Sequence, residues 1–387
     1  MSTAASRAAD RTRIAEIEAN IFSLRRAILF LNNEKSRMLK RLNSYAYPVL
    51  TLPNEITSEI FINFIPAYPS PPPLKGTLSP TTLTHVCHQW REIALSTRAL
   101  WCGILMPHSS DYDTSLPCLL ESWLSRSGGL PLSISMKDML NVIPEKAVSV
   151  LVRHRARWEY VALAVPSELI VLSMQGPMPL LRQFEVRPDN RWPLLSQPSP
   201  SPIRFYDVPR LRSVTLWEFH DPTGMFPWAQ LTSLTMIYPS KLSAILRQAV
   251  NLIHCHLFLR ADSQDLRDGI RLPALESLIL APYLDSVYTV DRPATDFLPA
   301  LIAPALRTLQ VHEGFLQPNP VRTIDSFLSR SGCSLRKLRI TGDTRSVGEG
   351  MYRANFQHCI PHISFDLSLT DYQTSAKKLA RRRYNIL

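Results

Sequence analysis

The sequence predicts an α+β fold in three parts: a long N-terminal helix, a small helical unit, and a repeat array of short parallel strands joined by helices and loops. Three observations carry this prediction. Residues 14–42 show a heptad pattern, residues 50–101 carry apolar residues at helical spacing, and one apolar triplet occurs eight times between residues 158 and 340. A chain of 387 residues can form two or three such units.

The first unit, residues 1–47, is expected to be a heptad helix. Its a positions are Ile14, Ile21, Ile28, Lys35 and Leu42, and its d positions are Ile17, Leu24, Leu31 and Met38. Phe22 and Leu29 fall at b and widen the apolar stripe, which suits a helix that packs on its own protein. A homodimer through residues 14–42 and a helix docked on the same chain both stay open. Because a dimer would leave Phe22 and Leu29 exposed, the sequence slightly favours docking.

The second unit is expected over residues 48–106. Pro53 suits the first turn of a helix in which Ile56, Ile60 and Phe64 recur at every fourth position. Six prolines between residues 66 and 80 predict an extended linker, and Ser79-Pro80 predicts the start of the next helix. That helix is expected to end near Leu100-Trp101 and to carry Leu83, Val86, Cys87, Trp90, Ile93 and Ala94.

The third unit, residues 107–370, contains the pattern apolar-x-x-apolar-x-apolar. The last two apolar residues of each triplet are separated by one residue, as in a strand with one buried face. Since units spaced by 20 to 31 residues cannot bury that face alone, we expect them to stack with these residues pointing inward. The triplets are Trp158, Val161, Leu163; Leu181, Phe184, Val186; Leu211, Val214, Leu216; Leu231, Leu234, Met236; Leu252, Cys255, Leu257; Leu275, Leu278, Leu280; Leu306, Leu309, Val311; and Leu335, Leu338, Ile340.

A second repeated motif supports one repeat domain. The segment from Glu121 to Gly128 is echoed by the segment from Asp325 to Gly332. Each predicts a helix with Arg in its last turn and Gly just past its end, followed by a strand. Proline-rich insertions such as Pro193 and residues 198–202 fall between repeats, where loops are tolerated.

The net charge of +11 is concentrated at the two ends of the chain. Residues 7–41 hold nine basic and four acidic side chains, and residues 377–383 hold five basic and none acidic, which leaves a surplus of one elsewhere. The body therefore lacks the basic face that nucleic-acid binding requires, and nucleic acid is not an expected partner. In the predicted tail, residues 371–387, a solvated segment is favoured over a nuclear-localisation patch.

The sequence contains no catalytic fingerprint, so we expect a protein that is not an enzyme and holds no cofactor. His85, Cys87 and His88, like His254, Cys255 and His256, lack zinc-ligand spacing, and no metal site is expected. The six cysteines form no CxxC pair, and no secretory signal or membrane span is evident. We therefore expect free thiols, a cytoplasmic and/or nuclear location and no membrane partner.

Residues 50–101 closely resemble an F-box. The resemblance rests on Leu52-Pro53-Asn54-Glu55-Ile56 with Ile60-Phe61, then Leu83, Val86-Cys87, Trp90-Arg91, Ile93-Ala94 and Leu100-Trp101. The proline-rich insertion and the WLSRSGGLPLSI stretch are similar to those of the large F-box families of mushroom-forming fungi. In those families a coiled-coil-like helix precedes the F-box and a leucine-rich-repeat-like domain follows it.

The resemblance implies a non-catalytic substrate receptor of an SCF-type cullin–RING ubiquitin ligase. The F-box would dock on a Skp-type adaptor, and the leucine-rich-repeat-like solenoid would present a protein substrate, whose identity the sequence does not reveal. The resemblance assigns the first adaptor-binding helix to Leu52, Pro53, Glu55, Ile56, Ile60 and Phe61. It assigns Val86, Trp90, Leu100 and Trp101 to holding the later helices together or contacting the adaptor.

Two features qualify this interpretation. The residues themselves favour a place in the helical core for Val86 and Trp90. The array also lacks the Asn that usually follows the strand in leucine-rich repeats, which predicts an irregular solenoid. The alternative function is a self-associating interaction scaffold whose F-box-like helices do not engage a ligase. Co-purification with a Skp-type adaptor separates the two functions.

Overall fold

The computed structural model describes residues 4–43, 48–106, 115–136, 145–165, 175–188, 204–205, 207–217, 219, 221–237, 239–259, 269–282, 297–342 and 346–366. The chain divides into two compact units, Met1–Ile60 and Phe61–Leu387, and each is described by itself. The predicted domain limits after residues 47, 106 and 370 stay predictions. Pro193, the prolines of 198–202 and the basic tail over 371–387 lie outside the described residues.

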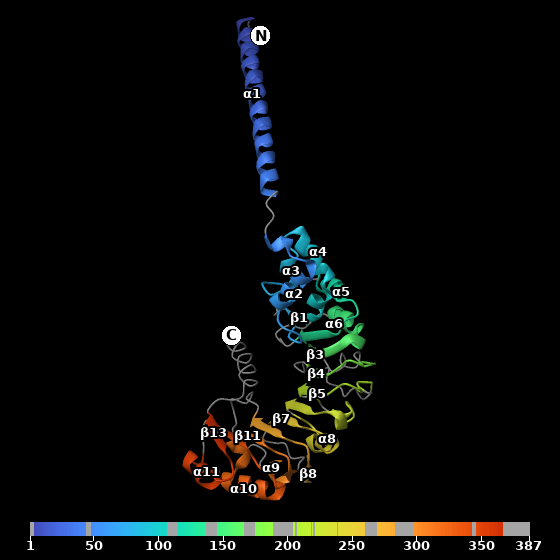
Figure 1. Cartoon of the computed structure of the whole chain (residues 1–387), viewed down its shortest axis with the longest axis vertical. Coiled ribbons are helices and arrows are strands. Elements are labelled where there is room, and N and C mark those ends of the chain that lie inside the picture. The colour runs from blue at the N-terminus through green and yellow to red at the C-terminus, as the bar shows by residue number, and fades with distance from the viewer. Residues whose placement is uncertain are drawn as a thin grey trace. The chain divides into compact units, whose positions relative to one another are not determined.

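The unit Met1–Ile60 contains the predicted long helix, α1 (Ala4–Asn43), seen at the top of Figure 1. Lys40 and Arg41 in its last turn complement the negative end of the helix dipole. A short 3-10 turn, η1 (Pro48–Thr51), precedes α2 (Asn54–Phe64), whose first turn carries Glu55. Both helices predicted for this part of the chain are therefore confirmed.

The helix predicted from Ser79 to about Trp101 is wrong in one respect, because the structure divides it into three pieces. They are α3 (Pro80–Leu83), α4 (His88–Ser96) and the 3-10 turn η2 (Arg98–Trp101). Ser79 caps α3 as predicted, accepting a hydrogen bond from the Thr81 amide at 3.2 Å. Cys87 is extended, and its Sγ accepts a hydrogen bond from the Trp90 amide at 3.5 Å, so a new helix starts there.

Among the described residues, eleven strands form one parallel sheet, with β1 and β13 at its two edges (Figure 1). Each strand pairs with its neighbours in chain order, except that β7 pairs directly with β9, and β9 with β11. The strands are β1 (Gly103–Leu105), β2 (Leu132–Met136), β3 (Trp158–Val165), β4 (Gln183–Pro188), β5 (Ser213–Trp217), β6 (Ser233–Ile237), β7 (His254–Leu259), β9 (Ser277–Pro282), β11 (Thr308–His312), β12 (Lys337–Thr341) and β13 (His362–Asp366). A separate small sheet pairs β8 (Ile270–Arg271) with β10 (Leu301–Ile302).

All eight predicted triplets lie on this sheet, and their inward residues are in register. Leu278 of β9 is paired with Cys255 of β7 on one side and Leu309 of β11 on the other. The same columns run from β3 to β12, and every inward residue in them is buried. The prediction that the triplets stack in one sheet with their last two apolar residues inward is therefore confirmed.

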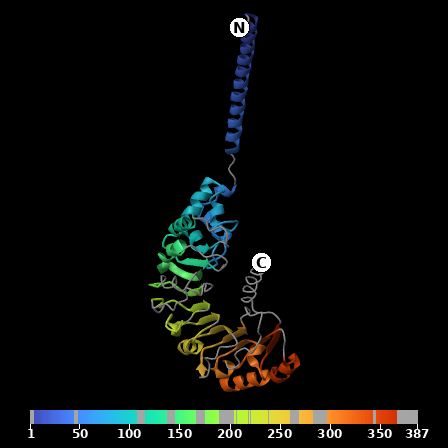
Figure 2. The ribbon, with the colours of Figure 1, turned by 180° about the vertical axis from the view of Figure 1, so that it is seen from behind.

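The helices pack against the inward face of the sheet. They are α5 (Leu116–Arg126), α6 (Glu145–Val152), α8 (Leu242–Gln248), α9 (Phe297–Ala300), α10 (Pro320–Ser331) and α11 (Glu349–Phe356), with 3-10 turns η3 (Arg155–Arg157), η5 (Trp228–Gln230) and η6 (Glu313–Leu316). One cluster of buried apolar residues joins these helices to the strands and extends from Phe61 to Ile360. Figure 2 shows the same stack of strands from behind.

The echoed motif forms the same helix–turn–strand arrangement twice. α5 and α10 both end just before a glycine with a left-handed backbone, Gly128 with φ +58° and Gly332 with φ +62°. Only glycine adopts such a conformation without steric cost, so these residues turn the chain back toward the sheet. The next strands are β2 and β12, as predicted.

The proline-rich segment is not the predicted linker, because it covers the free edge of β1. The Leu105 amide donates to the Pro72 carbonyl at 3.0 Å, and the Leu74 amide donates to the Leu105 carbonyl at 3.3 Å. Leu74 is buried, and a Cβ added at Gly103 would lie 2.5 Å from Cδ of Pro72. Prolines suit this place because they cannot donate hydrogen bonds to a further strand.

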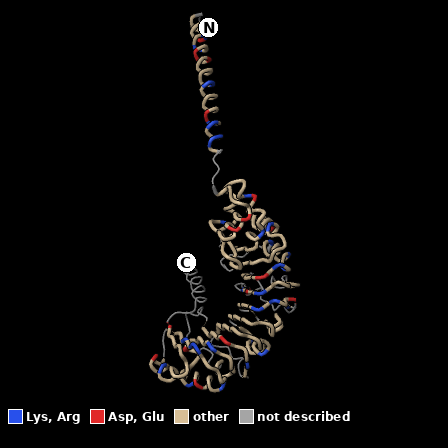
Figure 3. Tube along the Cα trace, viewed as in Figure 1, with Lys and Arg blue, Asp and Glu red and all other residues tan. Residues whose placement is uncertain are grey.

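The other face of the sheet carries a second, smaller apolar cluster. Trp217, Ile237, Phe258 and Ala281 are in register on β5, β6, β7 and β9, and all four are buried. Lys and Arg are interspersed with Asp and Glu along the described part of Phe61–Leu387 (Figure 3).

Candidate functional site

The residues expected to form the first adaptor-binding helix divide into exposed and buried sets. Ile56 and Ile60 are 50% and 47% exposed and lie one helical turn apart on α2. Phe64 continues the same face and is also exposed. Pro53 and Glu55 are exposed, and Leu52 is half-buried. We call Ile56, Ile60 and Phe64 the α2 face.

Phe61 points the other way, into the core. Its ring is buried and meets Trp90 of α4 edge to face, with the ring centroids 4.9 Å apart. Trp90 is half-buried, and its indole N–H is buried without a hydrogen-bond partner among the described residues. The pair joins the end of α2 to α4, so the core position predicted for Trp90 agrees with the structure.

Leu100 and Trp101 are also buried, and Trp101 connects the helical segment to α5. Its Nε1 donates to the Ala94 carbonyl at 2.9 Å, and its ring packs edge to face on Trp123 of α5 at 4.8 Å. The Arg126 guanidinium lies over the same ring, 4.6 Å from its centroid. Of the two roles expected for Leu100 and Trp101, holding the helices together is the one that these buried side chains can perform.

Val86 contradicts the core position that its spacing predicts. It lies in the turn between α3 and α4 and is 60% exposed. Among the described residues beyond α1, ten large apolar side chains are exposed, and seven of them lie between residues 49 and 86. These seven are Val49, Ile56, Ile60, Phe64, Tyr68, Leu78 and Val86. Of these, Ile56, Ile60 and Phe64 recur on one face of a single helix, as the residues of an interaction surface do.

Tyr68, Leu78 and Phe64 were not assigned a site role from the sequence. For Phe64 a signal existed, because it lies four residues after Ile60 and eight after Ile56. For Tyr68 and Leu78 no periodicity applies, since both lie in the proline-rich segment. Only the packing of that segment on β1 determines which of its side chains point outward.

A pocket of about 260 Å³ lies beside this segment. Its walls are mainly apolar and include Ile62, Ile65, Tyr68, Cys102, Leu130 and Glu159. The Tyr68 hydroxyl donates to Glu159 Oε2 at 2.7 Å, and Arg182 donates to Glu159 Oε1 at 2.7 Å. The Tyr68 hydroxyl and the Glu159 carboxylate at the pocket wall are thus already paired with each other.

The pocket has no activated nucleophile. Burial raises the pKa of Cys102 to about 11, so its thiol stays protonated at neutral pH. Burial and the hydrogen bond to Glu159 raise the pKa of Tyr68 well above its usual value, so the phenol keeps its proton. The pocket can hold an apolar group, and neither the Cys102 thiol nor the Tyr68 phenol at its wall is ionised at neutral pH.

The two histidine–cysteine trios are not brought together with further ligands. Cys255 is buried in the core, while His254 and His256 lie on the opposite face of β7. Within the described ranges, no three His, Cys, Asp or Glu residues come close enough to hold a metal ion. All six cysteines have free thiols.

Comparisons with known proteins add no relative: no family model matches the chain, and no curated protein matches it. In the part of the chain that the structure describes, no helix is both long and apolar enough to cross a membrane.

Proposed function

We propose that this chain is a non-catalytic substrate receptor of an SCF-type cullin–RING ubiquitin ligase. Residues 48–106 would act as an F-box that docks on a Skp-type adaptor, and the strand repeats would form a leucine-rich-repeat-like solenoid that presents a protein substrate. The observation that carries the proposal is the α2 face, where large apolar side chains are exposed on the helix that the F-box resemblance assigns to the adaptor.

The division between exposed and buried residues supports this proposal. An adaptor-docking helix needs an outward apolar face, supplied here by Ile56 and Ile60. It also needs an inward anchor that fixes its orientation, which Phe61 supplies through Trp90. Apolar anchors held in place by a rigid scaffold are the usual source of affinity in protein interfaces.

The start of each strand offers a surface for a substrate. The first residues of successive strands are in register on the face opposite the core, and they are polar and at least partly exposed. From β5 to β12 this row is Ser213, Ser233, His254, Ser277, Thr308 and Lys337. A polar row across parallel strands can hydrogen-bond an extended partner without disturbing the buried columns.

The test is capture of a purified Skp-type adaptor by the full chain. The double variant Ile56→Asp with Ile60→Asp should weaken binding by at least ~100-fold, because two apolar anchors become charged. Met351→Asp on α11 is the matched control, since Met351 is similarly exposed but lies far along the chain from α2. The control should bind the adaptor like the wild type.

Binding of the folded double variant at wild-type affinity would contradict the docking assignment. Absence of any adaptor binding by the folded wild type would contradict the receptor function itself. It would then favour the alternative, a self-associating scaffold whose helices serve another purpose.

A further inference from the structure

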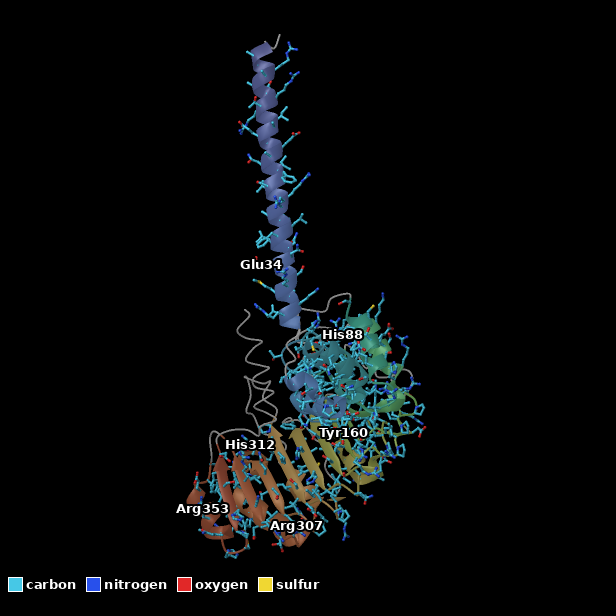
Figure 4. All side chains as sticks on the ribbon, turned by 45° about the horizontal axis from the view of Figure 1, so that its top comes forward. Glu34, His88, Tyr160, Arg307, His312 and Arg353 are labelled. Carbon is cyan, nitrogen blue, oxygen red and sulfur yellow. The ribbon has the colours of Figure 1, made fainter. Side chains whose placement is uncertain are left out.

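The α1 helix carries an apolar stripe that its own unit leaves open. Its apolar heptad residues are between 43% and 69% exposed, and every described side chain of α1 is exposed. At 1.5 Å per residue, its 40 residues span about 60 Å. Figure 4 shows its side chains radiating around the helix, with Glu34 labelled near its C-terminal end. We call the a and d residues from Ile14 to Leu42 the α1 seam.

We propose that α1 pairs with α1 of a second copy of this chain in a parallel, in-register coiled coil. The pairing itself is argued from α1 alone. Its consequence rests on the proposed function, because a dimeric receptor would carry two adaptor-binding segments and two substrate-presenting sheets. The seam repeats every 3.5 residues, the period of a left-handed two-stranded coil. β-Branched Ile at three a positions, with Leu at two d positions, favours two parallel strands.

The charges beside the seam favour the parallel orientation. Arg13 lies at g and Glu18 at the following e, so a parallel pair places Arg13 of each copy beside Glu18 of the other. Arg13 already contacts Glu16 of its own helix at 2.8 Å, but that pair is exposed and therefore weak. The later g–e pairs, Asn20 with Arg25, Ala27 with Asn32 and Glu34 with Leu39, contain no like charges.

An antiparallel pair meets repulsion instead. The alignment that sets Leu24 opposite Ile28 brings Arg25 against Arg25 of the second copy, and Arg13 against Arg41. Like charges at flanking positions are a known means of excluding wrong alignments. The sequence therefore carries one attractive pair for the parallel form and repulsive pairs against the antiparallel one.

Lys35 is the one charged residue in the seam. A single Lys at an a position lowers stability and limits the assembly to two strands. Glu34, the preceding residue, lies at g and offers each Lys35 a carboxylate across the pair. This arrangement favours a dimer over a larger bundle, which would bury the ammonium groups more deeply.

Light scattering of the full chain over a wide range of concentration tests the proposal. The expected mass is twice the 43.9 kDa of one chain. The seam variant Leu24→Asp with Ile28→Asp should raise the dissociation constant at least ~100-fold. The control Phe22→Asp with Leu29→Asp changes equally exposed residues at b and should alter it by less than ~3-fold.

Orientation is tested by cross-linking. In a background with Cys118 and Cys359, the two exposed thiols, changed to Ser, Ile14→Cys should form a covalent dimer on mild oxidation. Glu18→Arg should weaken the dimer, and adding Arg13→Glu to it should restore the affinity. A dimer that Ile14→Cys does not cross-link would overturn the parallel orientation.

A monomer at all concentrations would overturn the proposal, as would a trimer or tetramer. The proposal would also be overturned if the seam variant and the b variant changed the dissociation constant equally, because that result points to a docked helix. A monomer that binds vesicles of phosphatidylserine and phosphatidylcholine through α1 would identify a membrane-surface helix instead. Adaptor capture by the monomeric seam variant reports on the proposed function independently, so the two proposals fail separately.

Discussion

The α1 seam and the strand columns use similar apolar residues in periodic patterns, with opposite outcomes. The inward residues of the eight triplets are at most 3% exposed, whereas the apolar residues of the α1 seam are at least 43% exposed. Each strand that carries a triplet finds neighbouring strands on both sides and helices above it within the same unit. A lone helix cannot cover its own stripe. Periodicity thus determines which residues share a face, and burial depends on whether a second surface is supplied.

The largest expected effect tests this contrast with one kind of substitution in both regions. Leu278→Asp places a carboxylate in the core and should cost more than ~4 kcal/mol, enough to unfold Phe61–Leu387. Ile28→Asp on α1 should leave the thermal unfolding of that unit unchanged. Ser277→Asp, on the opposite face of the same strand, is the matched control and should be nearly silent. If Ser277→Asp and Leu278→Asp changed thermal unfolding equally, the assignment of Leu278 to the inward face would be wrong.

The next prediction makes the same contrast within residues 48–106. Trp101→Ala removes a buried ring that contacts Trp123 and Arg126, and should cost about 3–5 kcal/mol. Val86→Ala should change the free energy of unfolding by less than ~0.5 kcal/mol, because Val86 is exposed. Denaturant titration measures both. A large loss for Val86→Ala would show that this turn is packed in solution.

A smaller effect concerns a buried carboxylate. Glu313 is buried, accepts a hydrogen bond from the Tyr352 hydroxyl at 2.6 Å and another from the Ser346 amide at 2.7 Å. Tyr352→Phe should therefore cost about 1–3 kcal/mol in chemical denaturation. Tyr68→Phe removes a comparable hydrogen bond from an exposed side chain and should cost less than ~0.5 kcal/mol. If the two variants lost similar free energies of unfolding, burial would not determine what each hydrogen bond contributes.

The smallest expected effect concerns the backbone at the echoed helix ends. Gly332 has φ +62° with open space around it, so Gly332→Ala adds strain without a clash and should cost about 1 kcal/mol. Gly129→Ala, at a glycine with equally open surroundings and no left-handed backbone, should change stability by less than ~0.5 kcal/mol. Thermal unfolding resolves the pair, and equal values would argue against a specific need for glycine at residue 332.

Much of the fold could be predicted because each triplet carries its own strand signal. Leu275, Leu278 and Leu280, for example, define a strand and its buried face without any knowledge of their neighbours. β1 and β13 could not be predicted in this way. β1 is three residues long, and its free edge is covered by the proline-rich segment. That pairing brings together residues about thirty positions apart, and no local pattern reports it.

The candidate site was less predictable, because helical spacing does not specify which side of a helix faces inward. Val86 and Trp90 are four residues apart, yet one is exposed and the other packs on Phe61. The difference arises at Cys87, where the backbone becomes extended and a new helix begins. Across such a break between two short helices, helical spacing no longer indicates which residues lie on the same face.

The common register from β3 to β12 means that each strand adds one residue to every buried column. The shortest spacing, from Leu211 to Leu231, shows that 20 residues suffice for one strand and its return. Excising residues 211–230 would remove β5 and set Phe184 of β4 beside Leu234 of β6, so the buried column would continue unbroken. Duplicating the same stretch would lengthen the column by one rung. The polar row on the opposite face follows the same register, so its reach would change with the columns, one strand at a time.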